Sequence, residues 1–188
     1  MTAQFSDTVA YRGKDYAIAG LSGSALFDPR DHGLEPVARC TACWRGFLCS
    51  YLVDHQQLLL THLAVCLEDP APALFGVEPK ADTGQTALFD AIYEDVGYAL
   101  PYTGGLLLGR GFIEQLYVHM GFHPAWKYRK VHELIFEAGN LVGATDRSEE
   151  IAGFRKEVAD RPLRPGMEAE PAEIKRWIEQ CFSQRYKW

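Results

Sequence analysis

Two short segments carry the residues best suited to chemistry, and the first contains a histidine. His119 lies among apolar residues in LYVHMGF, residues 116–122. If this segment is a strand, alternation places His119 and Tyr117 on one face and Val118 and Met120 on the other. A histidine beside a tyrosine can bind a polar ligand, and it can equally be a structural histidine whose ring nitrogens have local partners. The sequence leaves both interpretations open.

The second segment is CWRGF, residues 43–47, in which Arg45 follows Trp44 at the head of a very apolar run. A guanidinium in this position can pair with a buried carboxylate, stack on an aromatic ring or bind the anionic group of a ligand. The many acidic residues of the chain favour the structural ion pair, and we expect Trp44 in the core. Arg45, Tyr102 and His119 together define an alternative, a small-molecule site on the face of a sheet.

The cysteines and glycines match no complete catalytic or metal-binding motif. Cys40 and Cys43 have the spacing of half a zinc knuckle, but no second pair follows. A redox-active CxxC opens a helix after a strand, whereas this one precedes a strand-like run. The glycine-rich segment TGGLLLGRGF matches neither a P-loop nor a dinucleotide fingerprint, and no GxSxG occurs. The sequence therefore predicts no metal, no cofactor and no catalytic residue.

Apolar runs bounded by turn residues predict the strands that position these candidates. We expect a hairpin over residues 7–23, a surface loop over 24–42, and a second hairpin over 44–67 that turns at DHQQ. A polar, proline-rich connector follows. Further strands are expected at residues 102–112, 115–122 and 132–138, and Gly139-Asn140 favours a tight hairpin with the next run.

Helical spacing appears in three segments. Leu88, Ile92 and Val96 lie four residues apart, which predicts a short amphipathic helix within residues 86–100. Two more helices are expected at 146–160, capped by Asp146 or Ser148, and at 170–188, and residues 161–171 between them read as a linker.

The expected fold is therefore α+β, with a curved, mostly antiparallel sheet or half-barrel and C-terminal helices packed on one side. Residues 1–165 form the domain. Residues 166–188 form an amphipathic helix that packs on it or reaches a neighbouring chain.

Charge narrows the classes of partner. The net charge is −6; residues 1–100 hold 6 basic and 13 acidic residues, whereas residues 101–188 hold 13 and 12. This balance argues against nucleic acid and anionic membranes as partners. An acidic half suits a basic protein partner, although it can also be a solvated surface. The five cysteines and the absence of a signal peptide or a long apolar run predict a cytoplasmic protein.

Several segments occur in an order that resembles a group of small uncharacterised bacterial proteins. They are ACWRGFLCSYLV, LLLTHLAV, YTGGLLLGRGF, LYVHMGF and ELIFEAGNLVG, between residues ~40 and ~145. Residues 68–100 depart from that pattern as a long insertion. The resemblance implies a bacterial source and a β-rich fold with no established activity. By analogy, small acidic bacterial proteins of this type often serve as antidotes to secreted toxins.

These observations lead us to expect a non-enzymatic protein-binding protein of the immunity or antidote type that covers a basic partner such as a toxin. The candidate binding residues are Trp44, Arg45, Tyr102, Tyr117 and His119. Two alternatives stay open. One is a small-molecule binder or enzyme that uses Arg45, Tyr102 and His119, and the other is a structural homodimer built through the last helix.

Overall fold

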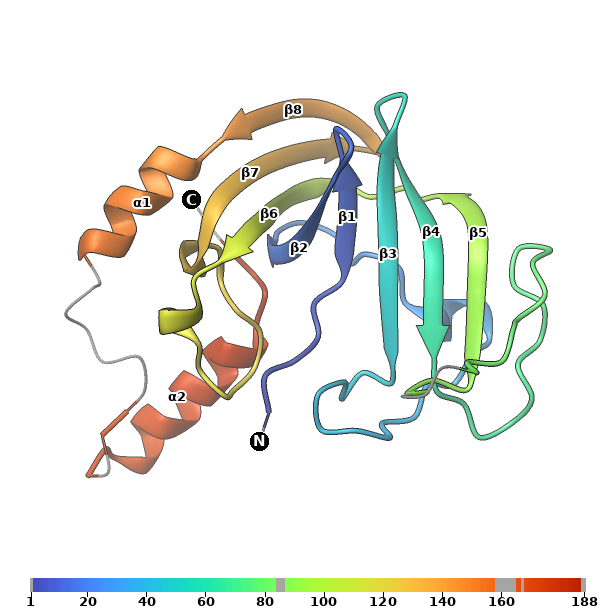
Figure 1. The fold of residues 1–188 in the computed structure, drawn as a ribbon, viewed down its shortest axis with the longest axis horizontal. Coiled ribbons are helices and arrows are strands. Elements are labelled where there is room, and N and C mark those ends of the chain that lie inside the picture. The colour runs from blue at the N-terminus through green and yellow to red at the C-terminus, as the bar shows by residue number, and fades with distance from the viewer. Residues whose placement is uncertain (1, 84–86, 158–164, 167, 187–188) are drawn as a thin grey trace.

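The computed structural model describes residues 2–83, 87–157, 165–166 and 168–186. Over these residues the chain forms a curved, mostly antiparallel sheet of eight strands and two C-terminal helices (Figure 1). The predicted fold class is confirmed. No helix among the described residues has the length and apolar character needed to span a membrane.

Eight strands follow one another along the described chain. Their bounds are β1 Thr8–Tyr11, β2 Lys14–Leu21, β3 Phe47–Asp54, β4 Gln57–Val65, β5 Ala91–Ala99, β6 Gly104–Phe112, β7 Tyr128–Glu137 and β8 Asn140–Asp146. The predicted hairpins at 7–23 and 44–67 and the turn at Gly139 are confirmed. In space the order is β3-β1-β2-β6-β7-β8-β4-β5, and β3 also pairs with β4. The pairing of β1 with β3 is parallel.

The sheet curls until β8 meets β4 at one corner. The first residue of β4 faces the first residue of β8, Gln57 opposite Asn140. Leu141 N donates to Gln56 O at 2.7 Å and Leu58 N donates to Gly139 O at 3.0 Å. Beyond this corner β8 and β4 diverge, so the sheet is a half-barrel, and β5 lies at its outer edge (Figure 1).

Side-chain alternation divides the apolar residues between two cores. In β6, Leu106 and Leu108 enter the large core inside the curved sheet, while Leu107 belongs to a smaller cluster on the outer face. That outer cluster includes Val131 of β7 and Ile151 of the first helix. Strands β2, β6 and β7 are therefore covered on both faces.

The helices lie at the same end of the molecule (Figure 1). Helix α1, Ser148–Glu157, is capped by Asp146, whose carboxylate accepts from Ser148 N at 2.8 Å, as predicted. Helix α2, Pro171–Phe182, touches the domain at its C-terminal end, where Phe122 N donates to Cys181 O at 2.7 Å. The following residues continue onto β2, since Leu21 N donates to Gln184 O. Residues 161–164 and 167 of the expected linker lie outside the described residues.

The helix expected within residues 86–100 is wrong, because Ala91–Ala99 form strand β5. Ala91 and Tyr93 are buried as alternation requires, but the next buried residue is Val96. A register irregularity near Asp95, whose φ is +53°, changes which face the later residues occupy. The spacing of Leu88, Ile92 and Val96 did not separate the two structures, because residues four apart lie on one face of a strand as well as of a helix.

Candidate functional site

Arg45 is held by a buried carboxylate. Its Nη1 and Nη2 donate to the two oxygens of Asp7 at 2.9 and 2.7 Å, and Asp7 also accepts from Cys49 N. Asp7 lies in the segment before β1, and it is only 5% exposed. The predicted ion pair is therefore present. The Arg45 guanidinium also lies over the rings of Phe47 and Phe122, at 4.7 and 5.8 Å from their centroids.

Arg45 also faces a pocket of about 220 Å³ between β2, β3 and the C-terminal tail. Arg30 and Arg185 line the same pocket. Tyr102 and His119 are not among its lining residues, so the structure does not bring together the three residues of the small-molecule alternative.

Tyr102 is sealed in the large core, at 1% exposure. Its hydroxyl lies 2.7 Å from Ser22 O and 2.9 Å from Gly105 O, which ties the start of β6 to the end of β2. Burial raises the pKa of this hydroxyl. Tyr102 therefore has a structural role.

Trp44 is not in the core, contrary to the expectation. It precedes β3 on a turn, is 48% exposed and stacks on Phe182 of α2, with ring centroids 4.9 Å apart and planes 13° apart. The apolar ring covers another apolar ring near the surface because α2 ends at this point. The sequence could not show this contact, since the partner lies 138 positions further along the chain.

The predicted strand through LYVHMGF is also wrong. Residues Glu114–Leu116 form a 3₁₀ turn, and the chain then continues as an irregular loop. Tyr117 and His119 are both exposed, and the Tyr117 hydroxyl lies 3.0 Å from His119 Nδ1. The expected proximity of these two residues is present, although a loop rather than strand alternation produces it.

This loop brings together two groups that sequence reasoning did not select, His123 and Lys127. Lys127 is 5% exposed, and its Nζ lies 3.4 Å from His123 Nδ1 and 5.4 Å from the ring centroid of Trp126. Among the described residues no carboxylate forms an ion pair with it. Burial lowers the pKa of Lys127 to about 8. Burial, with the nearby Lys127 charge, lowers the pKa of His123 to about 4.

Aromatic rings surround His123. Its ring centroid lies 4.6 Å from that of Phe112 and 5.2 Å from that of Tyr117. The available sequence signal was a lysine placed between Trp126 and Tyr128 directly before a strand. That pattern does not distinguish a buried lysine from one whose stem reaches the surface.

The two cysteines of the CxxC lie in different surroundings. Cys43 is buried and its thiol lies 3.3 Å from Phe47 O, while Cys40 lies at the rim of a separate hollow. Burial raises the pKa of the Cys43 thiol, which makes it a poorer nucleophile. In the described part of the chain no group of three potential metal ligands comes together.

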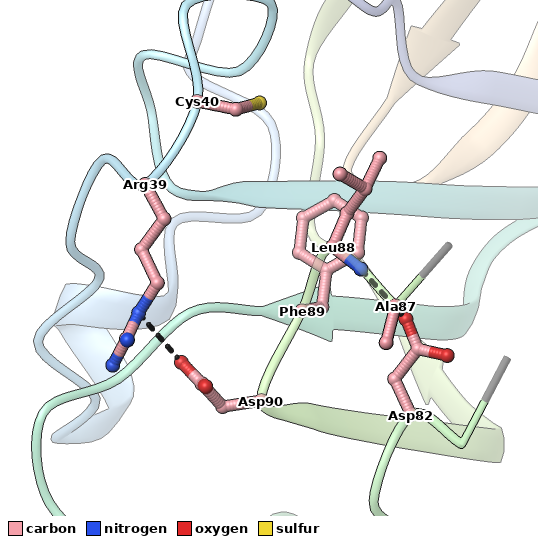
Figure 2. Close-up of a pocket in the computed structure, with 7 residues that line it drawn as sticks. All are labelled: Arg39, Cys40, Asp82, Ala87, Leu88, Phe89 and Asp90. Carbon is pink, nitrogen blue, oxygen red and sulfur yellow. Dashed lines mark hydrogen bonds and ion pairs between the residues drawn. The ribbon is translucent and has the colours of Figure 1, made fainter. Parts of the chain in front are cut away.

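A hollow of about 440 Å³ lies where the connector between β4 and β5 meets the loop before β3 (Figure 2). Arg39 binds Asp90 at 3.0 Å on one side, and Asp82 accepts from Leu88 N at 3.1 Å on the other. Leu88 and Phe89 lie between these polar groups (Figure 2). The hollow thus combines acidic oxygens with apolar side chains.

No protein-family model, no curated protein and no solved structure matches this chain.

Proposed function

We propose that this protein is a non-enzymatic protein-binding protein whose acidic region, defined as residues 66–95, receives a basic partner. An immunity protein that covers a toxin is the model for this activity. The observation that carries the proposal is charge density. The acidic region contains seven Asp or Glu residues and a single lysine, a net charge of −6, which equals the net charge of the whole chain.

Most of this charge is available to a partner. Glu68, Asp69, Glu78 and Asp95 are exposed, and none forms an ion pair with another described residue. Lys80 is itself paired with Glu94. The described residues of this region lie along and beyond β5, the edge strand (Figure 1). Clustered exposed charges of one sign accelerate association with an oppositely charged surface and select against like-charged proteins.

The hollow in Figure 2 adds a place for one partner side chain. Its carboxylates, Asp82 and Asp90, lie beside Leu88 and Phe89, and Asp90 also pairs with Arg39. A lysine or arginine has an apolar stem and a cationic head, so it matches this combination. Leu88 is 44% exposed, which leaves apolar surface for such a stem to cover.

The test is affinity purification from the native host with a charge-neutralised variant. The variant carries Glu68→Gln, Asp69→Asn, Glu78→Gln and Asp95→Asn. A matched control of equal charge carries Glu149→Gln, Glu157→Gln, Glu173→Gln and Glu179→Gln, all exposed positions of the two helices. We expect one basic protein in stoichiometric amount with the wild type and the control. We expect at least about tenfold weaker binding of that partner by the variant, and weaker binding as salt rises.

Two outcomes would overturn the proposal. One is that the wild type recovers no stoichiometric partner. The other is that it recovers one which the charge-neutralised variant binds equally well, because the acidic region would then not be the interface.

A further inference from the structure

The pocket beside Arg45 contains more positive than negative charge. Arg30, Arg45 and Arg185 line it together with Asp7 and Asp28. Asp7 is bound to Arg45, and Asp28 is bound to Arg30 at 2.8 Å. The third guanidinium, that of Arg185, forms no ion pair or hydrogen bond with any described residue. One positive charge in the pocket is therefore uncompensated.

Arg45 itself has N–H groups that make no hydrogen bond with the described residues. A guanidinium carries five N–H groups, and Arg45 uses two of them on Asp7. Its remaining donors have no hydrogen-bond partner in the described part of the chain, although its side chain is only 30% exposed. The rings of Phe47 and Phe122 fix its plane. A fixed, planar guanidinium with unused donors is well suited to a carboxylate.

The backbone of the C-terminal tail holds Arg185 at the pocket. Leu21 N donates to Gln184 O at 2.7 Å, and Tyr186 N donates to Leu21 O at 3.1 Å, so the tail is a short parallel addition to β2. The Gln184 side chain adds a bond to Ile18 O at 2.9 Å. The position of Arg185 next to the pocket is therefore set by three hydrogen bonds.

The rest of the lining is apolar and the space is small. Leu26, Phe27 and Phe47 are among the lining residues. The volume is about 220 Å³. It is below the range of roughly 300 to 1,000 Å³ that is typical of drug-sized ligands and cofactors. A small occupant with one anionic end and one apolar end matches this lining.

We propose that this pocket binds a small organic monocarboxylate with an apolar group. The carboxylate lies between Arg185 and the free donors of Arg45, and the apolar group lies against Phe27 and Phe47. The single uncompensated charge favours a monoanion over a doubly charged phosphate. This site is separate from the acidic region and does not depend on the protein-binding proposal.

The experiment titrates the full-length protein with butyrate, hexanoate and benzoate. Binding is followed by thermal shift and by amide chemical shifts in NMR. The amide counterparts, butyramide, hexanamide and benzamide, test the charge, and inorganic phosphate tests a general preference for anions. The variant is Arg185→Gln, and the matched control is Arg176→Gln, an exposed position of α2.

We expect saturable binding of at least one carboxylate, with shifts at residues 21–30 and 184–186. The neutral amides and the Arg185→Gln variant should bind at least about tenfold more weakly, while Arg176→Gln binds as the wild type does. Absence of saturable binding by all three carboxylates would overturn the proposal. Equal binding by Arg185→Gln, or equal binding of phosphate, would also overturn it.

Discussion

Two cations that the fold removes from water, Arg45 and Lys127, differ in what surrounds them. Arg45 has a carboxylate partner, Asp7, bound through two hydrogen bonds, and this partner raises the pKa of the guanidinium despite its burial. Lys127 has a histidine and an aromatic ring as neighbours, and burial lowers the pKa of its ammonium to about 8. Burial acts in the same direction on both groups, so the difference comes from the carboxylate.

The comparison distinguishes a buried charge that has a partner from a buried charge that has none. A paired buried charge contributes little net stability, but it becomes expensive when its partner is removed. An unpaired buried charge is expensive from the start, and a protein that keeps one tolerates a loss of stability at that point. Arg45 and Lys127 give these two cases within one chain.

The largest expected effect on stability comes from removing the carboxylate partner of Arg45, so that Arg45, like Lys127, has no countercharge. Asp7→Asn removes the countercharge, so the guanidinium remains half-buried without compensation. We expect the free energy of unfolding, measured with urea at pH 7, to fall by about 3 kcal/mol. Adding Arg45→Leu to Asp7→Asn should restore part of this loss, because the uncompensated charge is then gone. A double variant less stable than Asp7→Asn alone would contradict the argument.

The reverse change removes the charge of Lys127. Lys127→Met keeps the length of the side chain, and we expect it to raise the free energy of unfolding by about 2 kcal/mol at pH 7. The folded-state pKa of about 8 lies below the ordinary 10.5, so the unfolded chain binds the proton more tightly. Stability of the wild type should therefore rise between pH 8 and pH 10.5, and the advantage of the variant should shrink there.

Lys130→Met, at an exposed position of β7, is the control for this experiment. Its stability should follow the wild type across the same pH range. A profile of Lys127→Met parallel to that of the wild type would show that Lys127 is not the group that titrates.

His123 gives a smaller effect at acidic pH. Its folded-state pKa of about 4 lies below the ordinary 6.5, so the unfolded state binds the proton first as pH falls. Stability should fall between pH 6.5 and pH 4, by about 1 to 2 kcal/mol, and His123→Gln should remove this part of the slope. NMR titration of the imidazole should also show a higher pKa in Lys127→Met, because the neighbouring positive charge is absent. An unchanged pKa would mean that burial alone lowers it.

The smallest expected effect is the loss of stability when an exposed ion pair is broken. Arg30 and Asp28 form a pair whose side chains are 51% and 32% exposed. Asp28→Asn should cost about 0.5 kcal/mol or less in urea unfolding, because water already screens both charges. A cost as large as that of Asp7→Asn would remove the distinction between buried and exposed pairs.

Whether a secondary-structure prediction was correct depends on whether neighbouring residues alone determine the element. The hairpins at residues 7–23 and 44–67 were predictable because turn residues separate runs that pair with each other directly. Strand β5 was mistaken for a helix because apolar residues four apart occur on one face of a strand as well as of a helix. The LYVHMGF segment was mistaken for a strand because its apolar residues resemble those of a sheet, whereas the backbone at Gly121 and Phe122 bonds to the N-terminal segment and to α2.

By itself the sequence determined the class of the fold, the hairpins, the capped start of α1 and the concentration of acidic residues. Composition and short-range periodicity depend only on neighbouring residues, so they can be recognised in the sequence without a structure. Only the tertiary structure decided which charge has a partner. Asp7 and Arg45 are 38 positions apart and meet because β1 pairs with β3. The burial of Lys127 and the place of Arg185 likewise depend on segments that the curved sheet brings together.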